Sequence, residues 1–319
     1  MINGGLNVSV IIPTYGRSEL LERAILSALN QDYEHIEIIV VDDNDINSIE
    51  QIKTKKLIER LRIHHEIKYV EMIKNSGGPF ARNKGVEVSK GDYICFLDDD
   101  DEFIKNKISG QINVLKNSQR ELAVVGCFAE ILDEKGSHKR FEKNEIKGNV
   151  LFEQLKNNVC TTSIAMINKK KFVEVGGFDN VPSSQEHRLF IKIFKANPYY
   201  DYVPEVLVNI HHHEGTRISN GEKKSMGAIS LYEYIKSLEE YKSLSDQRKK
   251  EIDIAHYKNI IRAFMIGKGN RKKALKLYLL FSKKNKYNSE SIKYFLIIIF
   301  GLSNIEKLQK KIKNWKDRK

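Results

Sequence analysis

The sequence predicts an α/β protein with a parallel sheet flanked by helices on both faces, followed by a basic, all-helical C-terminal extension. Three observations lead to this fold class. In the first part of the 319 residues, short apolar runs alternate with helical patterns. Carboxylate clusters directly follow two of those runs. Beyond about residue 220, helical patterns rich in lysine replace the strands.

Apolar runs of strand length predict the first strands, which are Val8–Pro13, Ile36–Asp43, Ile67–Met72 and Asp92–Asp101. The segments between them have helical spacing and predict the helices Ser18–Asn30, Ser48–Arg62 and Gly78–Ser89. In such sheets, ligands bind beyond the carboxyl ends of the strands. We therefore expect one site where three polar clusters meet: Thr14–Arg17, Asp42–Asp45 and Asp98–Asp101.

The rest of the chain is less regular. Further extended segments are expected at Ala123–Leu132, Ser163–Asn168 and Tyr200–His213. A turn or short helix is expected at Phe172–Gly177, and a helix at Glu186–Lys195. The C-terminal helices are predicted at Ser225–Leu244, Asp246–Gly267, Arg271–Lys284 and Ser289–Phe300.

The positive charge of the chain is concentrated at its C-terminal end. Residues 220–319 contain 25 Lys and Arg against 10 Asp and Glu, a net charge of +15, whereas residues 1–219 carry the other 29 basic and 32 acidic residues, a net charge of −3. We therefore expect a catalytic domain over residues 1–219 and a basic helical extension over residues 220–319. Three widely spaced cysteines and the absence of a leader pattern favour the cytoplasm.

Four consecutive aspartates, Asp98–Asp101, follow the apolar run YICFL. Adjacent carboxylates repel one another, so the cluster needs a counter-cation. Hard oxygen ligands favour Mn²⁺ or Mg²⁺, which bridge carboxylates and substrate phosphates. The plainer interpretation is a solvated acidic turn that caps the next helix.

Two further motifs are suited to a phosphorylated nucleoside. Asn75–Gly85 contains paired glycines before Pro79, which suits the first turn of a helix, and a helix N-terminus favours an anion. In Pro13–Arg17, Tyr15 is a candidate to cover a nucleobase, and Asp42 is a candidate to hydrogen-bond a base edge. A simple loop with a helix cap explains the glycines equally well.

In this order, PTYGR, VVDD, NSGGPFARNKG and FLDDDD resemble the family 2 glycosyltransferases of the GT-A fold, over about residues 7–219. The resemblance implies a Rossmann-like mixed sheet flanked by helices. It also implies a nucleotide-sugar donor, with a UDP-sugar favoured. It implies that Asp42 contacts the base, that Arg82 lies near the uridine, and that Asp100 binds the metal ion. The implied donor site consists of Pro13, Thr14, Tyr15, Arg17, Asp42, Asn75, Gly78, Arg82, Asp98 and Asp99.

The catalytic base is implied by a later and looser match. The family often has Gly-Gly-Phe-Asp and then Glu-Asp, whose aspartate is the base. Here Gly176–Asp179 is followed by Gln185 and Glu186, so the base position holds a glutamate. The resemblance implies that Glu186 is the base and that Asp179, Gln185 and His187 lie on the acceptor side. Alternatively, Glu186 is an ordinary carboxylate at a helix start, and His187 is structural.

Three histidines, His211–His213, end the last extended segment. The resemblance implies a histidine near here that completes the metal site. His213 is the first choice and His211, on the same face of a strand, is the alternative. Polar packing explains them equally well.

The resemblance implies an inverting, metal-dependent hexosyltransferase that acts on a glycan or on a glycan carried by polyprenyl diphosphate. Such enzymes build surface polysaccharides such as O-antigen or capsule. The apolar run Tyr294–Leu302 has nine residues, too few to cross a bilayer, and a lysine-rich segment with Trp315 follows. This pattern favours peripheral docking on the anionic inner face of the cell membrane. Alternatively, these helices pack on the catalytic domain.

Three rival functions are weighed against this interpretation. A nucleotidyltransferase is the nearest enzymatic rival. A nucleic-acid-binding protein fits the basic extension, but no interleaved aromatic platform accompanies the charge, so no nucleic-acid partner is expected. A nicotinamide dehydrogenase would need a glycine-rich fingerprint after the first strand, where PTYGR stands instead.

Overall fold

The computed structural model describes residues 5–133, 135–212, 222–265, 271–285 and 289–300. The chain divides into two compact units. The sheet unit comprises residues 1–154, 158–180 and 185–214, and the helical unit comprises residues 155–157, 181–184 and 215–319. The predicted boundary between residues 219 and 220 lies outside the described residues and stays a prediction.

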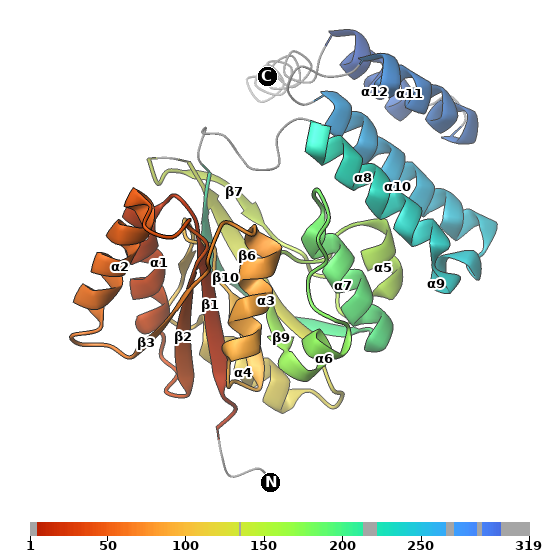
Figure 1. The fold of residues 1–319 in the computed structure, drawn as a ribbon. Coiled ribbons are helices and arrows are strands. Elements are labelled where there is room, and N and C mark those ends of the chain that lie inside the picture. The colour runs from red at the N-terminus through yellow and green to blue at the C-terminus, as the bar shows by residue number, and fades with distance from the viewer. Residues whose placement is uncertain (1–4, 134, 213–221, 266–270, 286–288, 301–319) are drawn as a thin grey trace, which may run out of the picture. The chain divides into compact units, whose positions relative to one another are not determined.

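A mixed sheet forms the centre of the sheet unit (Figure 1). Its strands are β1 (Val8–Thr14), β2 (Ile36–Asp42), β3 (Ile67–Glu71), β4 (Tyr93–Phe96), β5 (Glu102–Phe103), β6 (Val124–Leu132), β7 (His138–Glu142), β8 (Gly148–Asn149), β9 (Met166–Asn168) and β10 (Tyr199–His211). The main path runs β3-β2-β1-β4-β9-β6-β10-β5, with β7 beside β6 and β8 beside β10. The first four strands of this path are parallel, whereas β9 is antiparallel to both β4 and β6.

Helices cover both faces of this sheet. They are α1 (Ser18–Leu29), α2 (Ile49–Leu61), α3 (Gly78–Val88), α4 (Lys107–Asn117), α5 (Leu151–Lys156), α6 (Lys169–Glu174) and α7 (Gln185–Ala196). Figure 1 shows α1 and α2 on one side of the parallel strands and α3 on the other, where α3 packs against β1 and β2. The β-branched residues of β1 and β2 are mostly buried on both faces, as their predominantly apolar runs predict.

The predicted elements of the first half are present, with two informative differences. The strand expected over Asp92–Asp101 ends at Phe96, because the aspartates turn away from the sheet. Helix α4 was not predicted. Two of its fully buried positions are Lys107 and Gln111, whose side chains hydrogen-bond each other at 2.9 Å inside the core. Polar residues at core-facing positions concealed the apolar period of this helix.

The helical unit contains α8 (Glu222–Ser237), α9 (Glu239–Lys242), α10 (Asp246–Met265), α11 (Arg271–Asn285) and α12 (Ser289–Phe300). The single helix expected over Ser225–Leu244 is divided at Leu238, whose backbone is extended (φ −73°, ψ 140°). A second apolar core, including Ile261, Phe281 and Ile297, joins α10, α11 and α12. Among the described residues, no helix has the length and apolar character needed to cross a bilayer.

A short loop, residues 181–184, belongs to the helical unit although its neighbours in sequence belong to the sheet unit. The Ser183 hydroxyl donates a hydrogen bond to the backbone oxygen of Lys224, at 3.3 Å. A Cβ atom added to Gly227 of α8 would lie 2.0 Å from Ser183 Oγ and 2.7 Å from its backbone nitrogen. Only glycine permits this approach, so α8 and the loop pack backbone against backbone.

Candidate active site

Parallel strands deliver the polar clusters to one edge of the sheet. Thr14, at the end of β1, pairs with Asp42, at the end of β2. On its other side β1 pairs with β4, and beyond β4 the backbone nitrogen of Leu97 donates to the oxygen of Ile11 at 3.0 Å. The segment after β4 therefore brings its aspartates beside Thr14. The convergence expected at the strand ends is present.

The four aspartates do not point the same way. Carboxylate oxygens of Asp98, Asp100 and Asp101 lie within 4.8 Å of one another. Asp99 faces β1 instead, where it accepts hydrogen bonds from Thr14 Oγ1 at 2.9 Å and Arg17 Nη1 at 3.1 Å. Burial raises the pKa of Asp99 to about 6, although Arg17 opposes that shift. The other three carboxylates form a set of hard oxygen donors that fits Mn²⁺ or Mg²⁺.

Asp101 connects this cluster to β10. Its oxygens accept hydrogen bonds from Ser163 Oγ at 3.0 Å and from the backbone nitrogen of His211 at 3.1 Å. Burial raises the pKa of Asp101 well above its usual range. The His211 ring lies 2.7 Å, Nε2 to Oε1, from Glu102, so the backbone of His211 and not its imidazole contacts the cluster. His213, the first choice for a metal ligand, lies outside the described residues.

The end of β2 is a network of internal hydrogen bonds. Asp42 is buried and accepts from the Tyr69 hydroxyl at 2.6 Å and from the side-chain amide of Asn44 at 2.7 Å. Burial raises the pKa of Asp42, although both donors oppose that shift. Asn44 in turn accepts from the backbone nitrogen of Gly16, at 2.8 Å. In this structure, Asp42 is thus bound within the protein rather than pointing into solvent.

Asp43, which the sequence did not single out, fixes the glycine loop. Its two oxygens accept hydrogen bonds from the backbone nitrogens of Ser76 and Gly77, both at 2.8 Å. Asp45 accepts from the backbone nitrogen of Asn75, at 3.0 Å. These contacts hold the loop against the end of β2. The only sequence signal for this role was the second aspartate of VVDD.

The other predicted donor residues differ in their exposure. Tyr15 is 47% exposed and free to lie over a ligand. Pro13, the penultimate residue of β1, is partly buried, and Gly78 is the first residue of α3. Arg17 Nη1 lies 2.6 Å from Asp100 Oδ2. A guanidinium thus already neutralises part of the acidic cluster.

Arg82 of α3 links the acidic cluster to the candidate base. Its Nη2 forms an ion pair with Asp98 Oδ1. Its guanidinium carbon also lies 5.7 Å from the centre of the Phe178 ring. The charges of Arg82 and Glu186 act on each other, so the structure brings the predicted nucleotide-site arginine and the predicted base together.

Glu186 is the second residue of α7, and Thr162 hydrogen-bonds to its carboxylate. The Thr162 hydroxyl donates a short hydrogen bond to Glu186 Oε1, and the Thr162 backbone nitrogen donates to the same oxygen at 3.4 Å. Burial raises the pKa of Glu186, and the nearby charge of Asp98 adds to the rise, whereas Thr162 and Arg82 lower it. A carboxylate with a raised pKa is suited to accept a proton near neutral pH. No sequence motif identifies Thr162 as the hydrogen-bond partner of Glu186.

The expected acceptor-side residues have different surroundings. Asp179 forms ion pairs with Arg188 at 2.7 Å and Lys192 at 2.8 Å, and these pairs outweigh burial and lower its pKa. The His187 ring is buried, with Nε2 2.6 Å from the backbone oxygen of Gln154. Gln185 is the first residue of α7, directly beside Glu186.

The Gly-Gly-Phe-Asp turn is fixed by α3. Asn83 donates to the backbone oxygen of Phe178 and accepts from its nitrogen, both at 2.9 Å. Gly177 has a φ of 62°, and a Cβ there would lie 2.6 Å from Asn83 Oδ1. The asparagine of the ARNKG motif therefore determines where the chain runs before α7, a role that the motif alone did not indicate.

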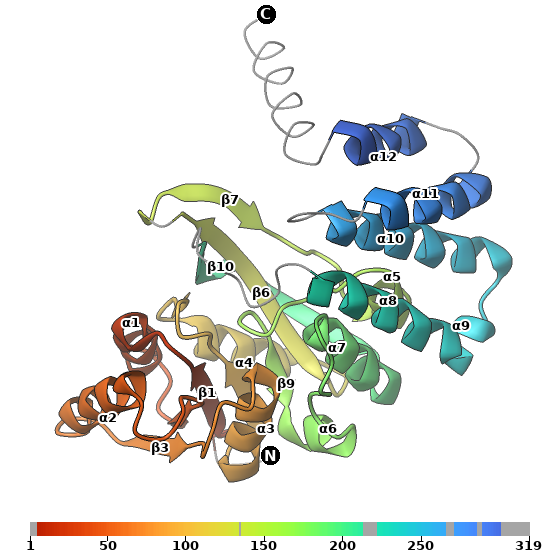
Figure 2. The same ribbon diagram turned by 45° about the horizontal axis from the view of Figure 1, so that its top comes forward.

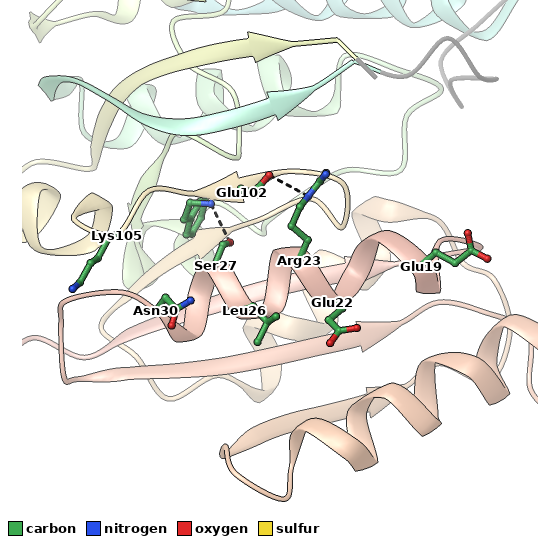
Figure 3. A pocket seen from close by; sticks show the side chains of 9 residues that line it. Glu19, Glu22, Arg23, Leu26, Ser27, Asn30, Glu102 and Lys105 are labelled. Atoms are coloured by element: carbon green, nitrogen blue, oxygen red, sulfur yellow. Dashed lines mark hydrogen bonds and ion pairs between the residues drawn. The ribbon is translucent and has the colours of Figure 1, made fainter. Parts of the chain in front are cut away.

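A groove of about 520 Å³ lies beside the aspartate segment, between α1 and the β5 region (Figure 3). Figure 3 shows Arg23 reaching from α1 to Glu102 across this groove, at 3.2 Å from Nε to Oε1. Another Arg23 nitrogen, Nη2, donates to the backbone oxygen of Asp100 at 2.6 Å. Arg23 therefore connects the groove to the acidic cluster, although the cluster itself does not line it.

A comparison with protein families agrees with this geometry. The sequence model of glycosyl transferase family 2 matches residues 9–176, which include both strand-end clusters, the glycine loop and the aspartates. The chain belongs to glycosyl transferase family 2. The resemblance inferred from four short motifs is confirmed.

Relatives in this family cover different shares of the chain. An uncharacterized glycosyltransferase of Rickettsia felis is 31% identical over 222 residues, which is 67% of this chain but only 36% of that protein. The chain thus spans about a third of that relative's length. The GalNAc(5)-diNAcBac-PP-undecaprenol beta-1,3-glucosyltransferase of Campylobacter jejuni is 28% identical over 313 residues, covering 95% of this chain and 96% of its own.

Among solved structures, residues 1–349 of TarS from S. aureus, in complex with UDP-GlcNAc, superpose with a TM-score of 0.58. The match covers 92% of this chain and 90% of the TarS chain at 14% identity, so it shows the fold. The predicted GT-A fold, a mixed sheet flanked by helices and followed by a helical region, is confirmed.

Proposed function

We propose that this glycosyltransferase moves a sugar from a UDP-sugar to a lipid-linked glycan, inverting the anomeric carbon, with the help of Mn²⁺ or Mg²⁺. One observation carries the proposal. Arg82 forms an ion pair with Asp98 of the acidic cluster, and its positive charge also lowers the pKa of the half-buried Glu186. A group that binds diphosphate and a group that accepts a proton are therefore close together, as a single displacement requires.

Each part of the reaction is assigned to particular residues of this chain. Tyr15 covers the nucleobase, and Arg17 and Arg82 bind the diphosphate. Glu186, oriented by Thr162, takes the proton from the acceptor hydroxyl as its oxygen attacks the anomeric carbon. The bond to the diphosphate oxygen breaks on the opposite face, so the configuration inverts. The transition state is oxocarbenium-like, as in glycoside cleavage.

The metal ion is assigned to Asp100 with Asp98. Asp101 already accepts hydrogen bonds from Ser163 and His211, so we assign it to orienting the segment. When bound, the ion would neutralise negative charge on the departing diphosphate. His213 stays the first candidate for an additional ligand and His211 the alternative.

The acceptor and the location rest on relatives. The Campylobacter relative is named for transfer to an undecaprenyl-diphosphate glycan, and it aligns with nearly the whole chain. The TarS complex contains UDP-GlcNAc on the same fold. Both favour a UDP-sugar donor and a polyprenyl-diphosphate acceptor in surface polysaccharide synthesis, such as O-antigen or capsule. A lipid-linked acceptor would in turn keep the enzyme at the cytoplasmic face of the membrane.

The test is a donor screen with the purified full chain. UDP-, GDP- and dTDP-sugars are incubated with Mn²⁺ and a short synthetic glycan on a polyprenyl diphosphate, and nucleoside diphosphate release is measured. UDP-sugars should give the highest rate, and NMR of the product should show inversion. A preference for another nucleotide, or retention of configuration, would reject that part of the proposal. Transfer of a nucleotidyl group to the acceptor would favour the nucleotidyltransferase instead.

A further inference from the structure

Helix α12 has apolar side chains on two faces. Tyr294, Ile297 and Ile298 are buried in the helical unit's core. A second set recurs at intervals of three and one residues along the exposed side: Ile292 (58% exposed), Phe295 (39%), Leu296 (36%), Ile299 (44%) and Phe300 (54%). A helix that is apolar all round belongs in a protein core or in a lipid environment.

Helix α11 continues this surface and adds positive charge. It packs beside α12, as Figures 1 and 2 both show. Leu275, Leu279 and Leu280 are exposed, and the exposed lysines Lys272 and Lys276 lie three or four residues from them on the same side of the helix. We call the exposed apolar residues of α11 and α12, together with these two lysines, the apolar-basic face.

The charge of α11 indicates which kind of partner binds the apolar-basic face. Its sequence, RKKALKLYLLFSKKN, contains six lysines and arginines and no acidic residue. A second copy of this face would bring like charges together, and so would the segment after residue 300, which is itself rich in lysine. An anionic lipid surface complements both properties, because apolar side chains enter the acyl boundary while lysine stems extend to the headgroups.

We propose that the apolar-basic face docks the protein on an anionic lipid leaflet as a peripheral, reversible anchor. None of its residues is assigned to the reaction, so this proposal does not depend on the donor or acceptor. The sequence left two alternatives for Tyr294–Leu302, which are membrane docking and packing within the protein. Within the described part of that run, some residues join the core and others face outward.

The experiment is vesicle co-sedimentation of the full chain. Vesicles of phosphatidylcholine with about 30% phosphatidylglycerol are compared with phosphatidylcholine alone, at low and high salt. The wild-type protein should pellet with the anionic vesicles at low salt and bind less at high salt. Phe295→Ser with Ile299→Ser, and separately Lys272→Glu with Lys276→Glu, should each weaken partitioning about tenfold or more.

The matched control replaces two exposed isoleucines of the sheet unit, Ile63→Ser with Ile73→Ser, and should bind like the wild type. All variants replace exposed side chains, and thermal unfolding verifies that they fold. Sugar transfer to a water-soluble acceptor analogue should be the same in wild type and the Phe295/Ile299 variant, which separates anchoring from catalysis. Equal vesicle binding by wild type and variants would overturn the proposal. So would a dimer that the Phe295/Ile299 variant abolishes while vesicle binding persists.

Discussion

Arg17 lies between two carboxylates of the aspartate segment, with Nη1 2.6 Å from Asp100 Oδ2 and 3.1 Å from Asp99 Oδ1. The guanidinium thus supplies the positive charge that four adjacent aspartates require. In the proposed reaction the same guanidinium binds the diphosphate. A metal ion would therefore compete with Arg17 for the carboxylate of Asp100. A donor would then bind the same guanidinium through its diphosphate.

Replacing this arginine should separate metal binding from donor binding. In Arg17→Gln, Mn²⁺ should bind the free protein about 2- to 5-fold more tightly, because a partly exposed ion pair of this kind is worth about 1 kcal/mol or less. The KM for the UDP-sugar should rise. Calorimetric titration with Mn²⁺ measures the first effect and initial rates the second. Arg60→Gln, which removes a surface ion pair with Glu22, is the control. Weaker Mn²⁺ binding in Arg17→Gln would contradict the assigned competition.

Removing the metal ion should stop transfer. Excess EDTA should abolish activity, and added Mn²⁺ or Mg²⁺ should restore it. Asp100→Asn should weaken Mn²⁺ binding by about 100-fold or more, since even partners one shell further out contribute about 10- to 100-fold. The variant should remain folded by circular dichroism. Full activity in EDTA would remove the metal from the mechanism.

The two candidate carboxylates of the acceptor side should behave differently. Glu186→Gln should lower kcat by about 10²-fold or more and leave UDP binding nearly unchanged, as expected for a lost general base. Asp179→Asn should mainly lower thermal stability, because Asp179 is held by Arg188 and Lys192. Steady-state rates and UDP titrations on both variants show which carboxylate is the base. An inactive Asp179→Asn beside an active Glu186→Gln would reverse the assignment.

Thr162 should determine the pH dependence. A base works when it is deprotonated, so transfer should fall as the pH drops through the raised pKa of Glu186. Thr162 lowers that pKa by donating to the carboxylate. Thr162→Val should therefore raise the pKa of Glu186 further and move the acidic limb of the kcat/KM profile to higher pH. Thr162→Ser retains the hydroxyl and should restore the wild-type profile. An unchanged acidic limb in Thr162→Val would mean that another group titrates.

Asp43 should matter for stability and donor affinity together. Its two oxygens hold the backbone nitrogens of Ser76 and Gly77, and hydrogen bonds to a charged group contribute about 1.5 to 3 kcal/mol. Asp43→Asn should lower the free energy of unfolding by about that amount in urea titrations and raise the donor KM. Glu87→Gln removes an exposed charge that pairs with Lys84 and should change stability by about 0.5 kcal/mol or less. Equal stability of both variants would show that Asp43 does not hold the loop.

The strands and the strand-end clusters were predictable because they depend on local sequence. Predominantly apolar runs of strand length marked β1 and β2, and Asp98–Asp101 stood out because the carboxylates are adjacent. The contacts that make the site work are non-local. Thr162 lies 24 residues before Glu186, and Asn83 lies 95 residues before Phe178. No periodicity links such pairs, and a buried lysine such as Lys107 contradicts the simple rule that charges stay outside. Only the fold reveals them.

The loop at residues 181–184 has a consequence for how relatives within this family can be recombined. It packs with α8 in the helical unit, through the close approach of Gly227 to Ser183, and it ends one residue before α7 and two before Glu186. The C-terminal helices are therefore not an interchangeable module. A chimera of two relatives should inherit the loop and the helices from the same parent, because a mismatched pair would shift the backbone that leads to Glu186.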